Sequence, residues 1–160
     1  MSAYLACLDL RNEIEQAINA GQMHTAHTLF ETLKTTVLRE LPDRLSARAF
    51  IAYAGRDFIH AYTKSHDLPK AETIYTDLYT KPDRLIPDAL LTSQTPEGKA
   101  TQGAKTASEL CLINMYLALG EFERALALFP NSGALPSSLQ AGASQTRRNL
   151  GTLSNEGKIR

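Results

Sequence analysis

The chain has 160 residues, enough for one domain with a buried core, and its 17 basic residues balance its 17 acidic residues. A formal net charge of zero provides no general attraction to nucleic acid or to an anionic membrane surface. No apolar run approaches the ~18 residues of a membrane span, and the N-terminus lacks the basic segment of a secretory signal. We therefore expect no association with a membrane.

Apolar residues recur with a helical period along most of the chain, and convincing strand-like alternation is lacking, so the sequence predicts an all-α fold. In the first expected helix, residues 2–20, the apolar stripe consists of Leu5, Leu8, Ile14 and Ile18. Pro42 is expected in the first turn of the third helix. The later helices are expected at 22–40, 43–65, 68–80, 96–119 and 121–129, with one short helical turn within 81–95.

The C-terminal part differs in composition from the rest of the chain. Residues 1–130 are expected to form a helical-repeat domain. Residues 131–160 are rich in small and polar side chains, and they predict a linker followed by a weak capping helix and a frayed tail. The charged residues of this segment are Arg147, Arg148, Lys158 and Arg160 against Glu156, which makes the tail basic.

One spacing of residues occurs three times, each time across an expected helix boundary. Each set starts with a small or aromatic residue and continues at intervals of four, five and four residues. The three sets are Ala17, Gly21, Ala26 and Phe30; Tyr62, His66, Ala71 and Tyr75; and Tyr116, Gly120, Ala125 and Phe129.

The residue types in these sets fit a tight turn between antiparallel helices. A turn of this kind favours a residue that tolerates positive φ, as glycine does at positions 21 and 120. The alanine after the turn allows close approach of the two helices, and the aromatic one turn later fills the space below the crossing. A hairpin of this kind leaves one apolar face open, so several hairpins must stack to complete a core.

The three sets resemble the turn-centred signature of the tetratricopeptide-repeat superfamily. The segments FIHAYTKSHDLPKAETIY and LINMYLALGEFERALALF also resemble pentatricopeptide repeats. The resemblance implies a right-handed α-solenoid of about three antiparallel helix hairpins. The units are irregular, because successive sets lie further apart than the about 34 residues of the family repeat.

Candidate catalytic and metal-binding patterns are weak. His24 and His27 share a helix face, but no cysteine pair or carboxylate–histidine cluster lies near them in sequence. The chain has no nucleophile elbow, glycine-rich phosphate loop or His-Glu-x-x-His motif. Cys7 and Cys111 lie within helical patterns and are expected to be buried free thiols, which favours a cytoplasmic location. We expect a non-enzymatic protein without a metal or cofactor.

The family resemblance implies a protein–protein interaction module, an adaptor or chaperone-like protein that binds a peptide or helix in a concave groove. Self-association through an exposed end hairpin is a second expected mode. The residues expected to line the groove are Arg48, Arg56, His60, Lys105 and Asn114. RNA binding is the alternative. The positions that match the base-reading sites of pentatricopeptide repeats hold Arg11, Arg56 and Leu110 instead of the Asn, Thr or Ser expected there, so RNA is the less favoured partner.

Overall fold

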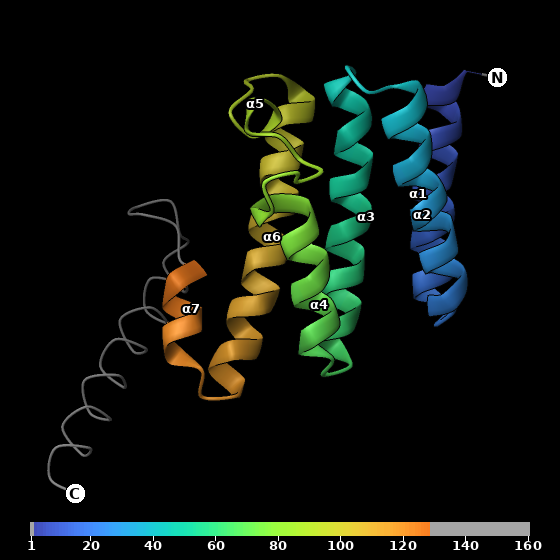
Figure 1. Ribbon diagram of the computed structural model, residues 1–160. Coiled ribbons are helices and arrows are strands. Elements are labelled where there is room, and N and C mark those ends of the chain that lie inside the picture. The colour runs from blue at the N-terminus through green and yellow to red at the C-terminus, as the bar shows by residue number, and fades with distance from the viewer. Residues whose placement is uncertain (1, 129–160) are drawn as a thin grey trace, which may run out of the picture. The chain divides into compact units, whose positions relative to one another are not determined.

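The computed structural model describes residues 2–128, and this part of the chain is helical without any strand, as the sequence predicts (Figure 1). The elements are α1 (Ala3–Asn19), α2 (Met23–Glu40), α3 (Leu45–Lys64), α4 (Leu68–Tyr75), the π-helix η1 (Thr76–Thr80), α5 (Asp88–Leu91), α6 (Pro96–Ala118) and α7 (Phe122–Leu128). The third helix starts later than expected, so Pro42 precedes it instead of lying in its first turn.

The chain divides into two compact units, Met1–Ser108 and Glu109–Arg160, and α6 contributes residues to both. The first unit contains the hairpin of α1 and α2 and the hairpin of α3 and α4. The second unit, as far as it is described, contains the end of α6 and the helix α7. The boundary predicted at residue 130 and the linker, capping helix and tail predicted at 131–160 lie outside the described residues.

The three hairpin turns share one backbone conformation. The central residue of each turn has a positive φ, which is 74° at Gly21, 63° at His66 and 74° at Gly120. In each turn the N–H after the central residue donates to the carbonyl five residues earlier, the bond that closes a Schellman motif. These bonds are Gln22 to Ala17, Asp67 to Tyr62 and Glu121 to Tyr116, each with an N–O distance of 2.8 Å. Three segments with different residues therefore end their first helix in the same way.

The residues around each turn are packed inside their own unit. The alanine after each turn, at positions 26, 71 and 125, has no solvent exposure. The aromatic residues Phe30 and Tyr75, one helical turn later, are also buried. Phe129, which holds the same position in the third set, lies outside the described residues. The small residue thus marks the close contact between the paired helices.

The buried stripe of α1 differs from the one expected. Leu5 and Leu8 are exposed, whereas Cys7, Ile14 and Ala17 are buried. The reason is that α1 packs against both α2 and α3, and these two contacts select a stripe that runs through Cys7 and leaves both leucines outside. Leu5 and Leu8 were wrongly assigned to the core.

The helix α3 is the most buried element of the first unit, and it contacts α1, α2 and α4. Gly55, at its middle, lies directly against Leu78 of η1. A β-carbon at Gly55 would lie 2.4 Å from the Cδ2 atom of Leu78. Glycine at this position therefore lets the π-helix approach α3 closely.

The π-helix η1 leads into a loop that folds back on it. The N–H groups of Leu85 and Ile86 donate to the carbonyls of Asp77 and Leu78, at 3.1 and 2.9 Å. A guanidinium N–H of Arg48 on α3 donates to the carbonyl of Leu85 at 3.0 Å. Ile86 is fully buried. These contacts fix the loop against α3. The carbonyls of Asp77 and Leu78 in the π-helix accept the hydrogen bonds of the loop N–H groups.

Candidate functional site

The most distinctive cluster of polar side chains lies where α1 meets α3. We call this cluster the α1–α3 face, and it consists of Arg11, Glu15, Tyr53, Arg56 and Asp57. On α1, Glu15 follows Arg11 by four residues. On α3, Arg56 and Asp57 follow Tyr53 by three and four residues, so each group occupies one side of its helix. The first helices of the first two hairpins thus place a compact set of charges around one tyrosine.

Two arginines flank the ring of Tyr53. The guanidinium carbon of Arg11 lies 5.8 Å from the ring centroid, and that of Arg56 lies 5.9 Å from it. These distances are within the range of cation–π attraction. Burial raises the pKa of the Tyr53 hydroxyl, and a hydrogen bond with Thr101 opposes this shift. Tyr53 therefore stays neutral and is held between the two helices and the start of α6.

An aromatic row continues this face toward the N-terminus of α1. The rings of Tyr53 and Phe50 have centroids 6.4 Å apart, and those of Phe50 and Tyr4 are 5.1 Å apart. Arg44 ends the row, with its guanidinium carbon 3.9 Å from the centroid of Tyr4. Arginines thus lie at both ends of a row of three aromatic rings in the first unit.

The ion pairs of the face leave two buried polar atoms without a hydrogen bond. Arg11 pairs with Glu15 at 2.5 Å, and the Nε atom of Arg56 lies 3.5 Å from an oxygen of Asp57. The Nε atom of Arg11 and the second oxygen of Asp57 are buried and have no partner. Burial raises the pKa of the Asp57 carboxyl, although Arg56 and Arg11 both act to lower it. Unpaired buried polar atoms are costly and uncommon, so these two need an explanation.

The five residues that the sequence analysis assigned to a groove have different surroundings in the structure. Arg56 belongs to the α1–α3 face, and His60 lies exposed one helical turn further along α3. Arg48 donates to the carbonyls of Leu85 and Pro42, at 3.0 and 3.4 Å, so it holds backbone segments in place. Lys105 lies 5.7 Å from the ring centroid of Tyr79. Asn114 is exposed and lies in the second unit.

Four members of the face, Arg11, Glu15, Tyr53 and Asp57, were not found as a cluster from the sequence. Arg11 was considered only as a match to a base-reading position, and Tyr53 and Asp57 were not singled out. The spacing of Tyr53, Arg56 and Asp57 on one helix side is a signal that the sequence does contain. The sequence contains no such signal for the contact between Arg11 and Tyr53, because these residues are more than forty positions apart.

His27 is part of the packing between the hairpins. The centroid of its ring lies 4.5 Å from the ring centroid of Phe58 on α3. Its Nε2 atom shares a hydrogen bond with the hydroxyl of Tyr62. Burial and the nearby Lys34 lower its pKa, so this imidazole is neutral at pH 7. His24 is exposed. In residues 2–128 no group of three or more His, Cys, Asp or Glu side chains is placed to hold a metal ion.

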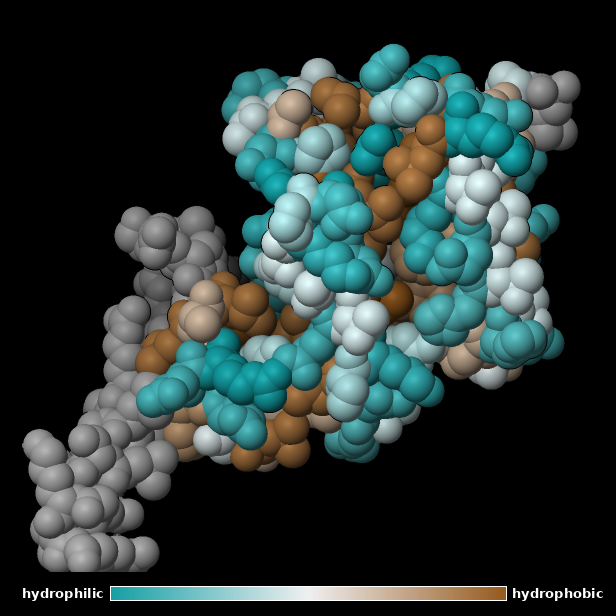
Figure 2. Space-filling model, in the orientation of Figure 1, coloured by the Kyte–Doolittle hydropathy of each residue, from teal (hydrophilic) through white to brown (hydrophobic). Residues whose placement is uncertain are grey.

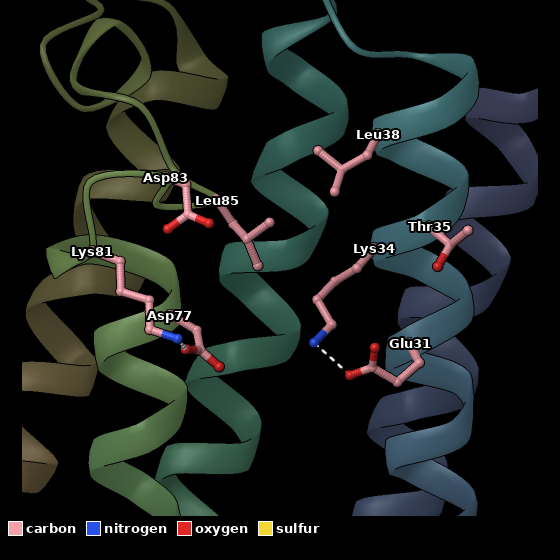
Figure 3. Close-up of a pocket in the computed structure, with 8 residues that line it drawn as sticks. All are labelled: Glu31, Lys34, Thr35, Leu38, Asp77, Lys81, Asp83 and Leu85. Carbon is pink, nitrogen blue, oxygen red and sulfur yellow. Dashed lines mark ion pairs between the residues drawn. The ribbon is translucent and has the colours of Figure 1, made fainter.

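A hollow of about 290 Å³ lies between α2 and η1, and we call it the α2–η1 pocket (Figure 3). One wall carries Glu31, Lys34 and Leu38 from α2. The opposite wall carries Asp77 from η1 and Lys81, the residue directly after η1. The loop after η1 adds Asp83 and Leu85. In the space-filling view, apolar surface is visible between hydrophilic side chains in the middle of this face (Figure 2).

No protein-family model, no curated protein and no solved structure matches the chain. Among the helices of the described residues, none has the length and apolar character needed to cross a membrane.

Proposed function

We propose that the chain is a tetratricopeptide-like interaction module that binds a segment of another protein on the α1–α3 face. In this proposal α1 and α3 are the first helices of successive repeats in a right-handed solenoid, and their shared side is the concave groove. The observation that carries the proposal is the cluster of Arg11, Tyr53, Arg56 and Asp57, with two buried polar atoms that lack a partner.

The residue types of the cluster support binding to a protein. Tyrosine and arginine are enriched among the residues that contribute most to the affinity of protein interfaces. Both are already ordered here, because Tyr53 is hydrogen-bonded to Thr101 and the arginines lie against its ring. Ordered side chains lose less entropy when a partner binds.

The unpaired atoms indicate which groups the partner would supply. The free oxygen of Asp57 needs a donor, and the Nε atom of Arg11 needs an acceptor. A peptide backbone offers both an N–H and a carbonyl at a short spacing. A segment that displaces the side chains covering both atoms and hydrogen-bonds to them would remove their desolvation cost in the bound state.

The common turn geometry supports the repeat part of the proposal. Three turns with positive φ and the same closing bond place three small residues at equivalent helix contacts. Equivalent turns favour equivalent hairpins, and stacked hairpins present their first helices side by side.

RNA is the alternative occupant, and the charges of the face favour it less. Arg11 is paired with Glu15 and Arg56 with Asp57, so the arginines are neutralised by their neighbours. Binding to phosphates would require these pairs to open. It would also weaken steeply with salt, because counterions are released from the nucleic acid.

The proposal is tested by affinity capture from the native cell with the full chain as bait. We expect Arg56→Glu to lose a protein partner that the wild type retains, because the change places a second acid beside Asp57. Arg39→Glu on the exposed end of α2 makes the same charge change away from the face and should retain the partner. Equal capture by all three chains would contradict the proposal. Salt-sensitive binding of single-stranded RNA that Arg56→Glu abolishes would favour the alternative.

A further inference from the structure

The α2–η1 pocket has an unbalanced charge that the α1–α3 face does not share. Its two lysines are each paired within their own segment, Lys34 with Glu31 and Lys81 with Asp77, both at 2.5 Å. Asp83 is the third carboxylate of the walls, and within residues 2–128 it forms no ion pair. The walls therefore have a formal charge of −1, and the unpaired charge is on Asp83.

The lysines are also engaged by other side chains. The ammonium of Lys34 lies 4.6 Å from the ring centroid of Phe30 on its own helix. The hydrogen bond with Asp77 and the charges of Asp77 and Asp83 raise the pKa of Lys81. Figure 3 shows Lys34 and Lys81 directed toward their acidic partners, with Asp83 above Lys81. A third cation can therefore approach Asp83 without displacing either pair.

An apolar surface adjoins this acid. Leu38 and Leu85 point into the gap from opposite sides (Figure 3). Leu38 is 45% exposed, so much of its apolar side chain faces the pocket and solvent. A side chain with an apolar stem and a cationic head would cover Leu38 and Leu85 with its stem and place its head at Asp83.

The wall that carries Asp77, Lys81 and Asp83 is irregular but well fixed. It consists of the π-helix η1 and the loop that Arg48 and the bonds from Leu85 and Ile86 hold in place. Short π segments inside helices occur often at functional sites. The backbone fixes the pocket in a position that a regular continuation of α4 would not produce.

We propose that the α2–η1 pocket binds an arginine side chain of a partner polypeptide. Arginine fits better than lysine, because its planar guanidinium can donate to the two oxygens of one carboxylate while its stem lies on the leucines. This site is independent of the α1–α3 face, since the two share no residue. Either site can fail its test while the other passes.

The test is an NMR titration of the full, ¹⁵N-labelled chain with N-acetyl-arginine-N-methylamide. The neutral comparison probe is N-acetyl-citrulline-N-methylamide, which has nearly the same shape. The expected result is saturable shifts at the amides of Leu38, Asp83 and Leu85, with a dissociation constant of about 1–10 mM for so small a probe. Citrulline should bind about two- to fivefold more weakly, as expected for the loss of one exposed ion pair.

Two variants separate the pocket from general charge effects. Asp83→Asn should weaken arginine binding about two- to fivefold. Asp43→Asn removes the same charge at an exposed position outside the pocket and should leave binding unchanged. Shifts outside the pocket, equal binding of the two probes, or unchanged binding by Asp83→Asn would overturn the proposal. Shifts at these amides that grow with protein concentration alone would assign the pocket to a second copy of the chain.

Discussion

His27 on α2 and Tyr62 on α3 share a hydrogen bond, and their rings are stacked with centroids 5.8 Å apart. The contact joins the first hairpin to the second through a neutral imidazole. Tyr62 is also the residue whose carbonyl accepts the closing bond of the second turn. Packing between the hairpins is thus coupled to the geometry of the turn.

The neutral state of His27 predicts a pH dependence of stability. Its pKa is lowered in the folded state, so the unfolded chain binds the proton more readily. The free energy of unfolding should be highest above pH 6.5, the ordinary value, and should fall as the pH drops toward the lowered pKa. Urea unfolding between about pH 5.5 and 7.5 measures this. His27→Gln should reduce the slope. An equal slope in the wild type and in His27→Gln would contradict the role given to His27.

The positive φ of His66 predicts a stabilising substitution. A side chain at φ 63° adopts a conformation that most L-residues avoid, whereas glycine adopts it readily. We expect His66→Gly to increase the free energy of unfolding by about 0.5–1 kcal/mol, and Gly21→Ala to decrease it by about 1 kcal/mol. Chemical denaturation measures both. A loss of stability in His66→Gly would show that the imidazole contributes more than its backbone strain costs.

The close approach of α3 and η1 predicts opposite effects for two glycines. Alanine normally stabilises a helix interior by about 1 kcal/mol relative to glycine. Gly103 on α6 has open space around it, so Gly103→Ala should show this gain. Gly55→Ala would force a methyl group against the fully buried Leu78, and the overpacking should make it less stable than the wild type by about 1 kcal/mol. Thermal unfolding compares the two variants, and stabilisation by both would contradict the packing at Gly55.

The raised pKa of Asp57 predicts a conflict between stability and binding. Burial disfavours its ionised form, so Asp57→Asn should increase the free energy of unfolding at pH 7 by about 0.5 kcal/mol. The gain should shrink as the pH falls to the raised pKa, because the wild-type carboxyl then becomes neutral as well. The same variant should capture less partner, since the acceptor oxygen is changed to a weaker one. Reduced stability together with unchanged capture would assign Asp57 a structural role.

Much of the fold could be predicted because it depends on local pattern. Helical periodicity locates α1, α2, α6 and α7 to within a few residues. The failures involve contacts between distant segments. Leu5 and Leu8 were assigned to the core because their spacing is helical, yet the buried side of α1 is set by both α2 and α3.

The candidate site was harder to predict for the same reason. Arg56 was chosen from its position on a first helix, and it lies in the α1–α3 face. Arg48 was chosen by the same rule, but it donates to Leu85, whose loop position depends on the π-helix. No local sequence signal identified that π-helix. Periodicity therefore gave the scaffold, whereas the partners of each charged side chain required the packed structure.

The most direct test of the proposed groove is site-specific photo-crosslinking in the native cell. A photoreactive phenylalanine analogue would replace His60, at the rim of the α1–α3 face, or Thr32, on the exposed side of α2. We expect a polypeptide adduct from position 60 that disappears when Arg56→Glu is added, and no such adduct from position 32. An adduct from position 32 alone, or an RNA adduct from position 60, would contradict this expectation.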